Sequence, residues 1–155
     1  MVFEDIVRLL SSSGVPFGIH EHEPVTTMQD VEAKLPFPKD CLLKSLVFKV
    51  GTTWVAAVIK AADRLDYRML ADACGVKREA LCRPTVDELA GELGVEPGGI
   101  SPILGMDGQK VIFDRQVFGM STVFCGVGRN DRTLEIAVRD LVQVSRGEVY
   151  QIVRS

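Results

Sequence analysis

The pattern of apolar and polar positions predicts short amphipathic helices placed between short strands. Residues 3–12 carry apolar side chains at the three- and four-residue spacing of one helix face, with acidic residues in the first turn. The capping residues Thr26 or Thr27, Asp66 and Thr85 predict helices that run to about residues 34, 74 and 93. A further short helix is expected near residues 139–145.

Runs of β-branched and aromatic residues predict the strands. Gly51 and Thr52 separate two such runs by the length of a tight hairpin turn. Hairpins mixed with short helices imply an α+β fold: a single domain over residues 1–155, with a central, mixed but mostly antiparallel sheet flanked by short helices. The expected strands cover residues 17–21, 43–50, 53–60, 110–114, 121–125, 133–138 and 148–153.

Lys44 is an unusual residue in the strongest of these strands. Alternation places it on the same face as Leu46, Phe48 and Val50. An ammonium group on an apolar face is costly unless it extends to water, is paired, or binds an anionic or polar ligand. Strand geometry alone favours extension to water, and it leaves the ligand-binding alternative open.

Composition and charge restrict the class of protein. The chain has 155 residues, of which 46% are hydrophobic, enough for a genuine core, and 25% are charged. No apolar run reaches membrane-spanning length and the acidic start lacks the basic region of a signal peptide, so we expect a cytoplasmic protein without membrane contact. The net charge of −3 argues against an indiscriminate nucleic-acid binder, but it permits a local basic patch. Candidates for such a patch are Lys44, Lys49, Lys60, Lys110, Arg115, Arg129 and Arg132.

The cysteine and histidine residues give no metal-site pattern. The four cysteines lack the spacing of zinc ligands and are most simply small buried hydrophobic residues. His20 and His22 lie two apart, on one strand face, but no third ligand stands at a suggestive spacing. We therefore expect edge or surface histidines, with neither a metal nor a cofactor.

Three glycine-rich or acidic segments are candidates for ligand contacts. The loop at 97–102 contains two adjacent glycines that can direct backbone N–H groups at an anion or an oxyanion; a tight surface turn is the alternative. Asp114 ends a strand, either as a ligand-binding carboxylate or, as general grounds favour, as a cap for the following turn. Gly126 and Gly128 lack the βαβ setting of a dinucleotide site.

Five segments of the chain follow the order found in one known family. They are residues 44–48 (Lys-Ser-Leu-Val-Phe), 63–66 (Asp-Arg-Leu-Asp) with Leu70-Ala71 beyond them, 98–102 (Gly-Gly-Ile-Ser-Pro), 112–114 (Ile-Phe-Asp) and 126–129 (Gly-Val-Gly-Arg). From about residue 15 to its end, the chain resembles the YbaK-type aminoacyl-tRNA deacylases. Those proteins share their fold with the editing insertion domain of bacterial prolyl-tRNA synthetases.

The resemblance implies a site and a chemistry. Lys44 would contact the terminal phosphate or ribose of the tRNA and orient the ester. The Gly-x-x-x-Pro loop would hold the aminoacyl group, and its backbone N–H groups would stabilise the oxyanion. The family generally uses no protein nucleophile and no metal, so the attacking group would be water assisted by a ribose hydroxyl, or the thiol of a cysteinyl substrate. The remaining expected substrate-binding residues are Gly98, Gly99, Ile100, Ser101, Pro102, Asp114, Gly126, Gly128 and Thr133.

The leading hypothesis is a free-standing, trans-editing deacylase of Cys-tRNA(Pro) or a related misacylated tRNA, with prolyl-tRNA synthetase as a further partner. Ser45 replaces the threonine that is usual in the family, and the residue that tunes amino-acid choice could be Asn130, Asp131 or Thr133. The His-Pro-Leu pattern of the alanine-specific branch is missing around Cys125, which favours the cysteine-editing branch. A non-catalytic module that binds tRNA or a synthetase is the alternative. A thiol- or metal-dependent enzyme is a third hypothesis.

Overall fold

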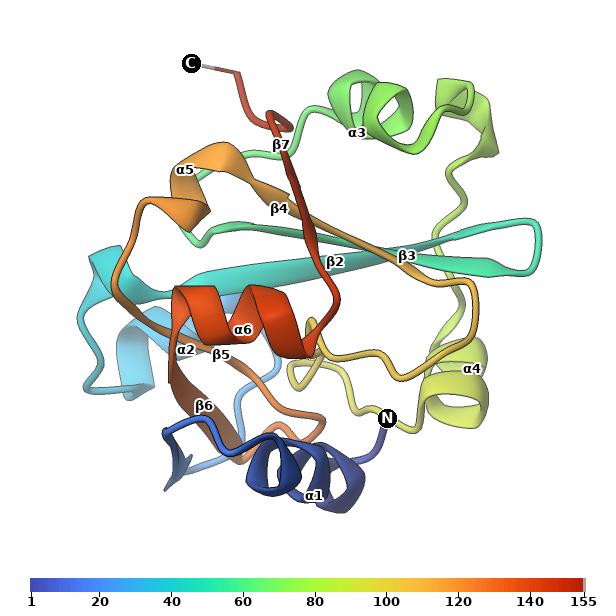
Figure 1. Ribbon diagram of the computed structural model, residues 1–155. Helices are drawn as coiled ribbons and strands as arrows, with labels where there is room; N and C mark the ends of the chain where they lie inside the picture. The colour runs from blue at the N-terminus through green and yellow to red at the C-terminus, as the bar shows by residue number, and fades with distance from the viewer. Residues whose placement is uncertain (155) are drawn as a thin grey trace.

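Two β-sheets form the centre of the molecule (Figure 1), a computed structural model that describes residues 1–154. One sheet has four strands in the order β2-β3-β4-β7, and the other has three strands in the order β1-β6-β5. The strands are β1 (Phe17–Glu21), β2 (Leu43–Val50), β3 (Thr53–Lys60), β4 (Lys110–Asp114), β5 (Thr122–Gly126), β6 (Arg132–Ala137) and β7 (Glu148–Tyr150).

The α+β class and the antiparallel-rich pairing are confirmed. All pairs of the three-stranded sheet are antiparallel, as is the β2–β3 hairpin, whereas β3–β4 and β4–β7 are parallel. The strands divide between two sheets because β2 pairs fully on one side only; its other edge meets β5 through a single bridge, Leu42 to Phe124. The hairpin turn is the expected one, with Gly51 at a φ of 62° closing the pair Val50 and Thr53.

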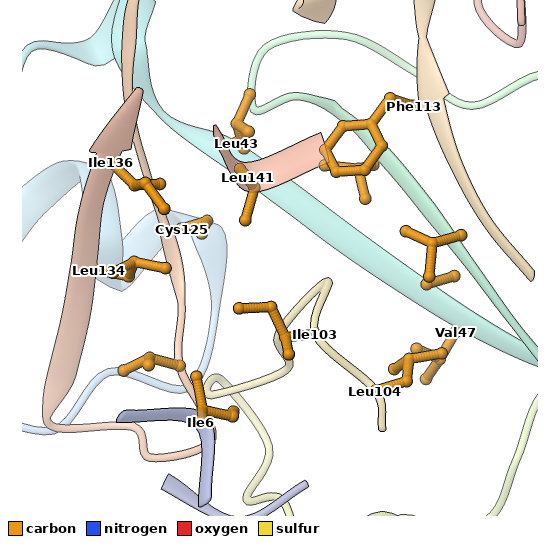
Figure 2. Close-up of a cluster of buried hydrophobic side chains, with 14 of the residues drawn as sticks. Ile6, Leu43, Val47, Ile103, Leu104, Phe113, Cys125, Leu134, Ile136 and Leu141 are labelled. Atoms are coloured by element: carbon orange, nitrogen blue, oxygen red, sulfur yellow. The ribbon is translucent and has the colours of Figure 1, made fainter. Parts of the chain in front are cut away.

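The main hydrophobic core fills the space between the two sheets (Figure 2). Val47 and Phe113 reach it from the four-stranded sheet and Leu134 from the three-stranded sheet, while Ile6 of α1 covers one side. A second cluster packs the opposite face of the four-stranded sheet against α3, through Ile59, Leu70 and their neighbours. Residues 54–59 of β3 are therefore all buried, which explains the near-continuous apolar sequence of this central strand.

The helices begin at the predicted caps. Thr27 accepts a hydrogen bond from Asp30 N, Asp66 accepts one from Met69 N, and Thr85 forms the reciprocal capping box with Glu88. The α-helices are α1 (Phe3–Ser13), α2 (Met28–Lys34), α3 (Tyr67–Cys74), α4 (Val86–Glu88), α5 (Arg115–Phe118) and α6 (Val138–Val144). The single-turn elements are η1 (Lys39–Cys41), η2 (Arg78–Ala80) and the π-helical η3 (Leu89–Leu93).

Two of the differences from the sequence prediction involve Asp114. Its side chain accepts a hydrogen bond from Gln116 N and so begins the unpredicted helix α5. The same carboxylate accepts hydrogen bonds from Ile152 N and Val153 N. The last strand therefore ends at Tyr150 rather than at residue 153, because these N–H groups turn to the carboxylate and not to a neighbouring strand.

Among the helices of residues 1–154, none combines the length and the apolar character that crossing a membrane requires.

Candidate functional site

A cavity of about 360 Å³ lies where the partly unpaired edge of β2 faces β5. Its floor is the outer face of the three-stranded sheet, around Phe124 and Thr133, and α2 covers it with Met28 and Val31. The lining comes from residues 25–28, Val31, Leu35, residues 42–46, Arg83, Gly98, Ile100, residues 124–126, Arg132 and Thr133. Segments distant in the chain thus form one concave, largely apolar site with a few polar groups, the usual character of a small-molecule site.

Half of the predicted site residues line this cavity and half do not. The lining includes Lys44, Gly98, Ile100, Gly126 and Thr133. The others lie behind the cavity wall or elsewhere in the fold: Gly99, Ser101, Pro102, Asp114 and Gly128.

Lys44 lies near the start of β2, with its side chain partly buried at the cavity. Burial lowers the pKa of its ammonium group, and the negative charge of Asp63 partly opposes that shift. Asp63, Arg64 and Glu32 act on Lys44 through charge alone, without a hydrogen bond. Lys44 thus lines the cavity and forms no ion pair with an acidic side chain of residues 1–154.

The glycines around the cavity permit backbone segments to approach each other closely. A Cβ atom on Gly98, whose φ is 84°, would collide with the carbonyl oxygen of Val25. A Cβ atom on Gly126 would collide with the carbonyl oxygen of Ile100. The loop at 97–102 is therefore held between residues 25–26 and β5, and only glycine fits at these contacts.

In the loop at 97–102, some backbone N–H groups donate to backbone carbonyl groups and others do not. Gly99 N–H donates to Glu96 O at 2.9 Å, and Gly128 N–H donates to Gly99 O at 2.7 Å, so these two glycines fix the loop against the segment after β5. The N–H groups of Gly98 and Ile100 find no backbone acceptor within residues 1–154. Both residues line the cavity, so these N–H groups are candidate donors to a ligand there.

Ser101 and Asp114 are buried and bonded within the fold. Ser101 Oγ accepts from Ile103 N at 3.0 Å. The Asp114 carboxylate accepts three backbone hydrogen bonds, of 2.9 to 3.2 Å, that join β4 to α5 and to the chain end. These contacts account for Asp114 as a cap, the alternative that the sequence favoured on general grounds.

Three basic side chains line the cavity: Lys44, Arg83 and Arg132. Arg132 is paired with Asp131 and Glu21, whereas Arg83 is exposed and lies over the ring of Phe48.

Arg83 was not predicted from the sequence. It is brought here because the backbone of the preceding Cys82 pairs with Lys49 on the free edge of β2, a long-range contact without a local sequence signal. Other candidate cations are paired elsewhere: Lys49 with Glu88 and Glu92, and Arg129 with Asp131.

The two histidines bond to different partners on the face of the three-stranded sheet. His20 Nε2 lies 2.7 Å from Glu135 Oε1, and His22 Nε2 lies 2.8 Å from Thr133 Oγ1. Within residues 1–154, no group of three or more His, Cys, Asp or Glu side chains is arranged to hold a metal ion.

Burial raises the pKa of the cavity-lining Cys125 thiol to about 12, which makes this thiol a poor nucleophile at neutral pH.

A family model described as an aminoacyl-tRNA editing domain matches residues 22–144. The chain belongs to this family. The matched span contains all the residues that line the cavity, so the cavity is part of the editing domain itself. A search of proteins with curated descriptions finds no match.

Solved structures share the fold of this editing domain at low sequence identity. A proposed trans-editing enzyme for prolyl tRNA synthetase matches with a TM-score of 0.82 and 18% identity, covering 99% of this chain and 97% of that one. The hypothetical protein APE2540 matches with a TM-score of 0.82 and 20% identity over 96% and 99% of the two chains. A signal transduction protein candidate from Marinobacter aquaeolei VT8 matches with a TM-score of 0.69 and 16% identity; the match covers 97% of this chain but 31% of that longer one. At these identities the likeness shows the fold alone.

Proposed function

We propose that this editing domain hydrolyses the ester bond of a misacylated tRNA. The observation that supports this proposal is that Lys44, Gly98 and Ile100 line one cavity of an aminoacyl-tRNA editing domain. The N–H groups of Gly98 and Ile100 have no backbone acceptor within residues 1–154. The cavity volume of about 360 Å³ suits a small aminoacyl group attached to a terminal nucleotide that is partly outside.

Each group in the cavity has a chemical role in this proposal. Lys44 binds the terminal phosphate or ribose and orients the ester, and the exposed guanidinium of Arg83 adds a second phosphate contact at the rim. Water attacks the ester carbonyl carbon, and the N–H groups of Gly98 and Ile100 stabilise the resulting oxyanion. Collapse of this intermediate breaks the acyl bond to the ribose oxygen, which leaves as a hydroxyl group. The neighbouring ribose hydroxyl of the substrate relays the proton: it accepts one from the attacking water and donates its own to the leaving ribose oxygen.

For the substrate we propose tRNA for proline that carries cysteine, or a related small amino acid. The side chain would lie against Met28, Val31 and Phe124, an apolar wall that suits a thiol or a methyl group better than a charge. When the amino acid is cysteine, its own thiol can replace water as the attacking group. A fold shared with a proposed trans-editing enzyme supports prolyl-tRNA synthetase as the partner.

The decisive experiment measures deacylation of tRNA(Pro) charged with cysteine, alanine, serine or threonine, with correctly charged Pro-tRNA as the control. Lys44→Ala should lower kcat/KM for the preferred substrate by about a hundredfold or more, because it removes a preorganised charge from the reacting centre. Lys77→Ala, an exposed lysine outside the cavity lining, is the matched control and should keep full activity.

Full activity of Lys44→Ala would overturn the assignment of Lys44. Tight binding of an acylated tRNA without hydrolysis of any tested pair would show instead a binding module with the same cavity.

A further inference from the structure

His22 connects the cavity floor to the backbone but has no part in the proposed mechanism. Its ring bonds on both sides: Nδ1 lies 2.7 Å from the carbonyl oxygen of Glu23, and Nε2 lies 2.8 Å from Thr133 Oγ1. Thr133 lines the cavity, and its residue is only 7% exposed. The histidine therefore acts on the cavity through one buried hydroxyl group.

The chemistry of these three groups permits a single direction of hydrogen bonding when the ring is neutral. The carbonyl oxygen of Glu23 can only accept, so Nδ1 must carry the proton. A neutral imidazole then has a lone pair at Nε2, and the hydroxyl of Thr133 must donate to it. With its proton committed to His22, Thr133 Oγ1 can offer only lone pairs to any other group.

The surroundings hold the ring in this orientation. The backbone N–H of His22 donates to Asp131 O at 3.1 Å, which extends the β1–β6 pairing by one residue. The ring of Phe37 meets the His22 ring nearly edge-on, at 75° between their planes. His22 is thus fixed by its backbone, by both of its ring nitrogens and by an aromatic neighbour.

We propose that His22 is a positioning residue that makes the Thr133 hydroxyl an acceptor on the cavity floor, for a polar hydrogen of the aminoacyl group. The identity of this ligand rests on the proposed function, whereas the direction of the hydrogen bonds does not. The polar hydrogen belongs either to the α-ammonium group, common to all substrates, or to a side-chain thiol or hydroxyl. In the second case His22 contributes to amino-acid selection.

The tautomer of His22 is directly measurable in the free protein. Long-range proton–nitrogen NMR spectra at pH 8, where imidazole side chains are generally neutral, should show the proton on Nδ1 of His22. His20 is the internal comparison, because it occupies the same sheet face but bonds to Glu135. A proton on Nε2 of His22 would overturn the proposal without any bearing on deacylase activity.

A double-mutant cycle tests whether His22 acts through Thr133. His22→Leu and Thr133→Val should each lower kcat/KM by about tenfold, the magnitude expected for one well-placed hydrogen bond. The double variant should lose no more than Thr133→Val alone, and Thr133→Ser, which keeps the hydroxyl, should retain most activity. Two results would overturn the proposal. One is a double variant whose loss of kcat/KM equals the combined losses of the single variants. The other is an unchanged kcat/KM in His22→Leu beside a large loss in Thr133→Val.

Comparison of substrates then identifies the polar hydrogen. Losses confined to cysteine- and serine-charged tRNA, with alanine-charged tRNA spared, assign it to the side chain. Equal losses for all three assign it to the α-ammonium group. His20→Leu is the matched control and should leave the ratio of rates among the three substrates unchanged. If the wild-type protein hydrolyses none of them, the proposed function fails, while the NMR result still decides the role of His22.

Discussion

At the scale of single residues, Lys44 places at the cavity an amino group whose protonation is opposed by burial. Desolvation is the largest influence on its pKa and lowers it from 10.5, while Asp63 raises it and Arg64 lowers it. One carboxylate oxygen of Asp63 is itself buried without a hydrogen-bond partner in the described part of the chain. Asp63 is thus positioned to keep Lys44 protonated, and this effect can be measured.

Asp63→Asn should lower the pKa of Lys44 further, because it removes the main negative charge that opposes desolvation. Arg64→Gln should have the opposite effect and raise it, because a neighbouring positive charge is lost. NMR titration of the Lys44 side chain, selectively labelled at Cε, measures both shifts. The prediction is contradicted if the two variants shift the pKa in the same direction.

The same signs fix the pH dependence of binding at this site. In the proposed function the charged form of Lys44 binds a phosphate, so substrate affinity should fall as pH rises through the lowered pKa of Lys44. In the Asp63→Asn variant the decline should begin at lower pH than in the wild-type protein. Binding of uncharged tRNA, which has no aminoacyl ester, separates this effect from alkaline hydrolysis of that ester.

At the scale of elements, the site depends on the close approach of the loop at 97–102 to β5. Gly126→Ala should destabilise the protein by about 1–3 kcal/mol, because its Cβ atom meets the carbonyl oxygen of Ile100 and forces the loop outward. Gly91→Ala is the matched control: a Cβ atom there meets nothing within 4 Å. Chemical denaturation gives both free energies of unfolding, and equal values for the two variants would contradict the prediction.

Asp114 joins three elements, so its removal should affect stability and not catalysis. Asp114→Ala leaves three backbone N–H groups without their acceptor and should lower the free energy of unfolding by about 2 kcal/mol or more. Thermal unfolding measures the loss, and kcat/KM of the folded fraction should equal that of the wild-type protein. A large fall in kcat/KM with unchanged stability would return Asp114 to the substrate-binding set.

Local signals in the sequence predicted most elements correctly. The β2–β3 hairpin and the caps at Thr27, Asp66 and Thr85 depend on residues next to one another, and the structure confirms them. The end of β7 was wrong by three residues, because Asp114 takes N–H groups from a segment 38 and 39 residues away. The parallel pairing of β3, β4 and β7 likewise joins distant residues and has no local pattern.

At the scale of the whole molecule, the net charge of −3 means that the proposed binding of tRNA requires a local group of cations. Arg83→Ala should weaken tRNA binding and reduce the slope of log affinity against log salt by about one, because one phosphate contact is lost. Arg115→Ala is the control, since Arg115 bonds to Gln151 and does not line the cavity. Binding titrations from low to moderate salt measure both slopes, and an unchanged slope for Arg83→Ala would exclude a phosphate contact.

The sequence predicted those parts of the candidate site that depend on a local sequence pattern. A lysine on an apolar strand face and a glycine-rich loop are visible in the sequence, and the cavity brings Lys44, Gly98 and Ile100 together. The place of Arg83 at the cavity and the His22–Thr133 contact were not predictable, because each depends on pairing between segments far apart in the chain. Ser101 and Asp114 carried the same polar signal as the cavity residues, and only their buried hydrogen bonds set them apart.

The order of strands in the smaller sheet has a consequence for synthesis of the protein. Among the described residues 1–154, β1 pairs only with β6, and the His22–Thr133 contact spans 111 residues. While the ribosome makes the intervening chain, β1 has no partner strand, and its edge is open to association with other chains. A nascent chain also lacks the cavity floor until β6 has emerged. The cavity of this editing domain therefore cannot form before residues 132–137 have been synthesised.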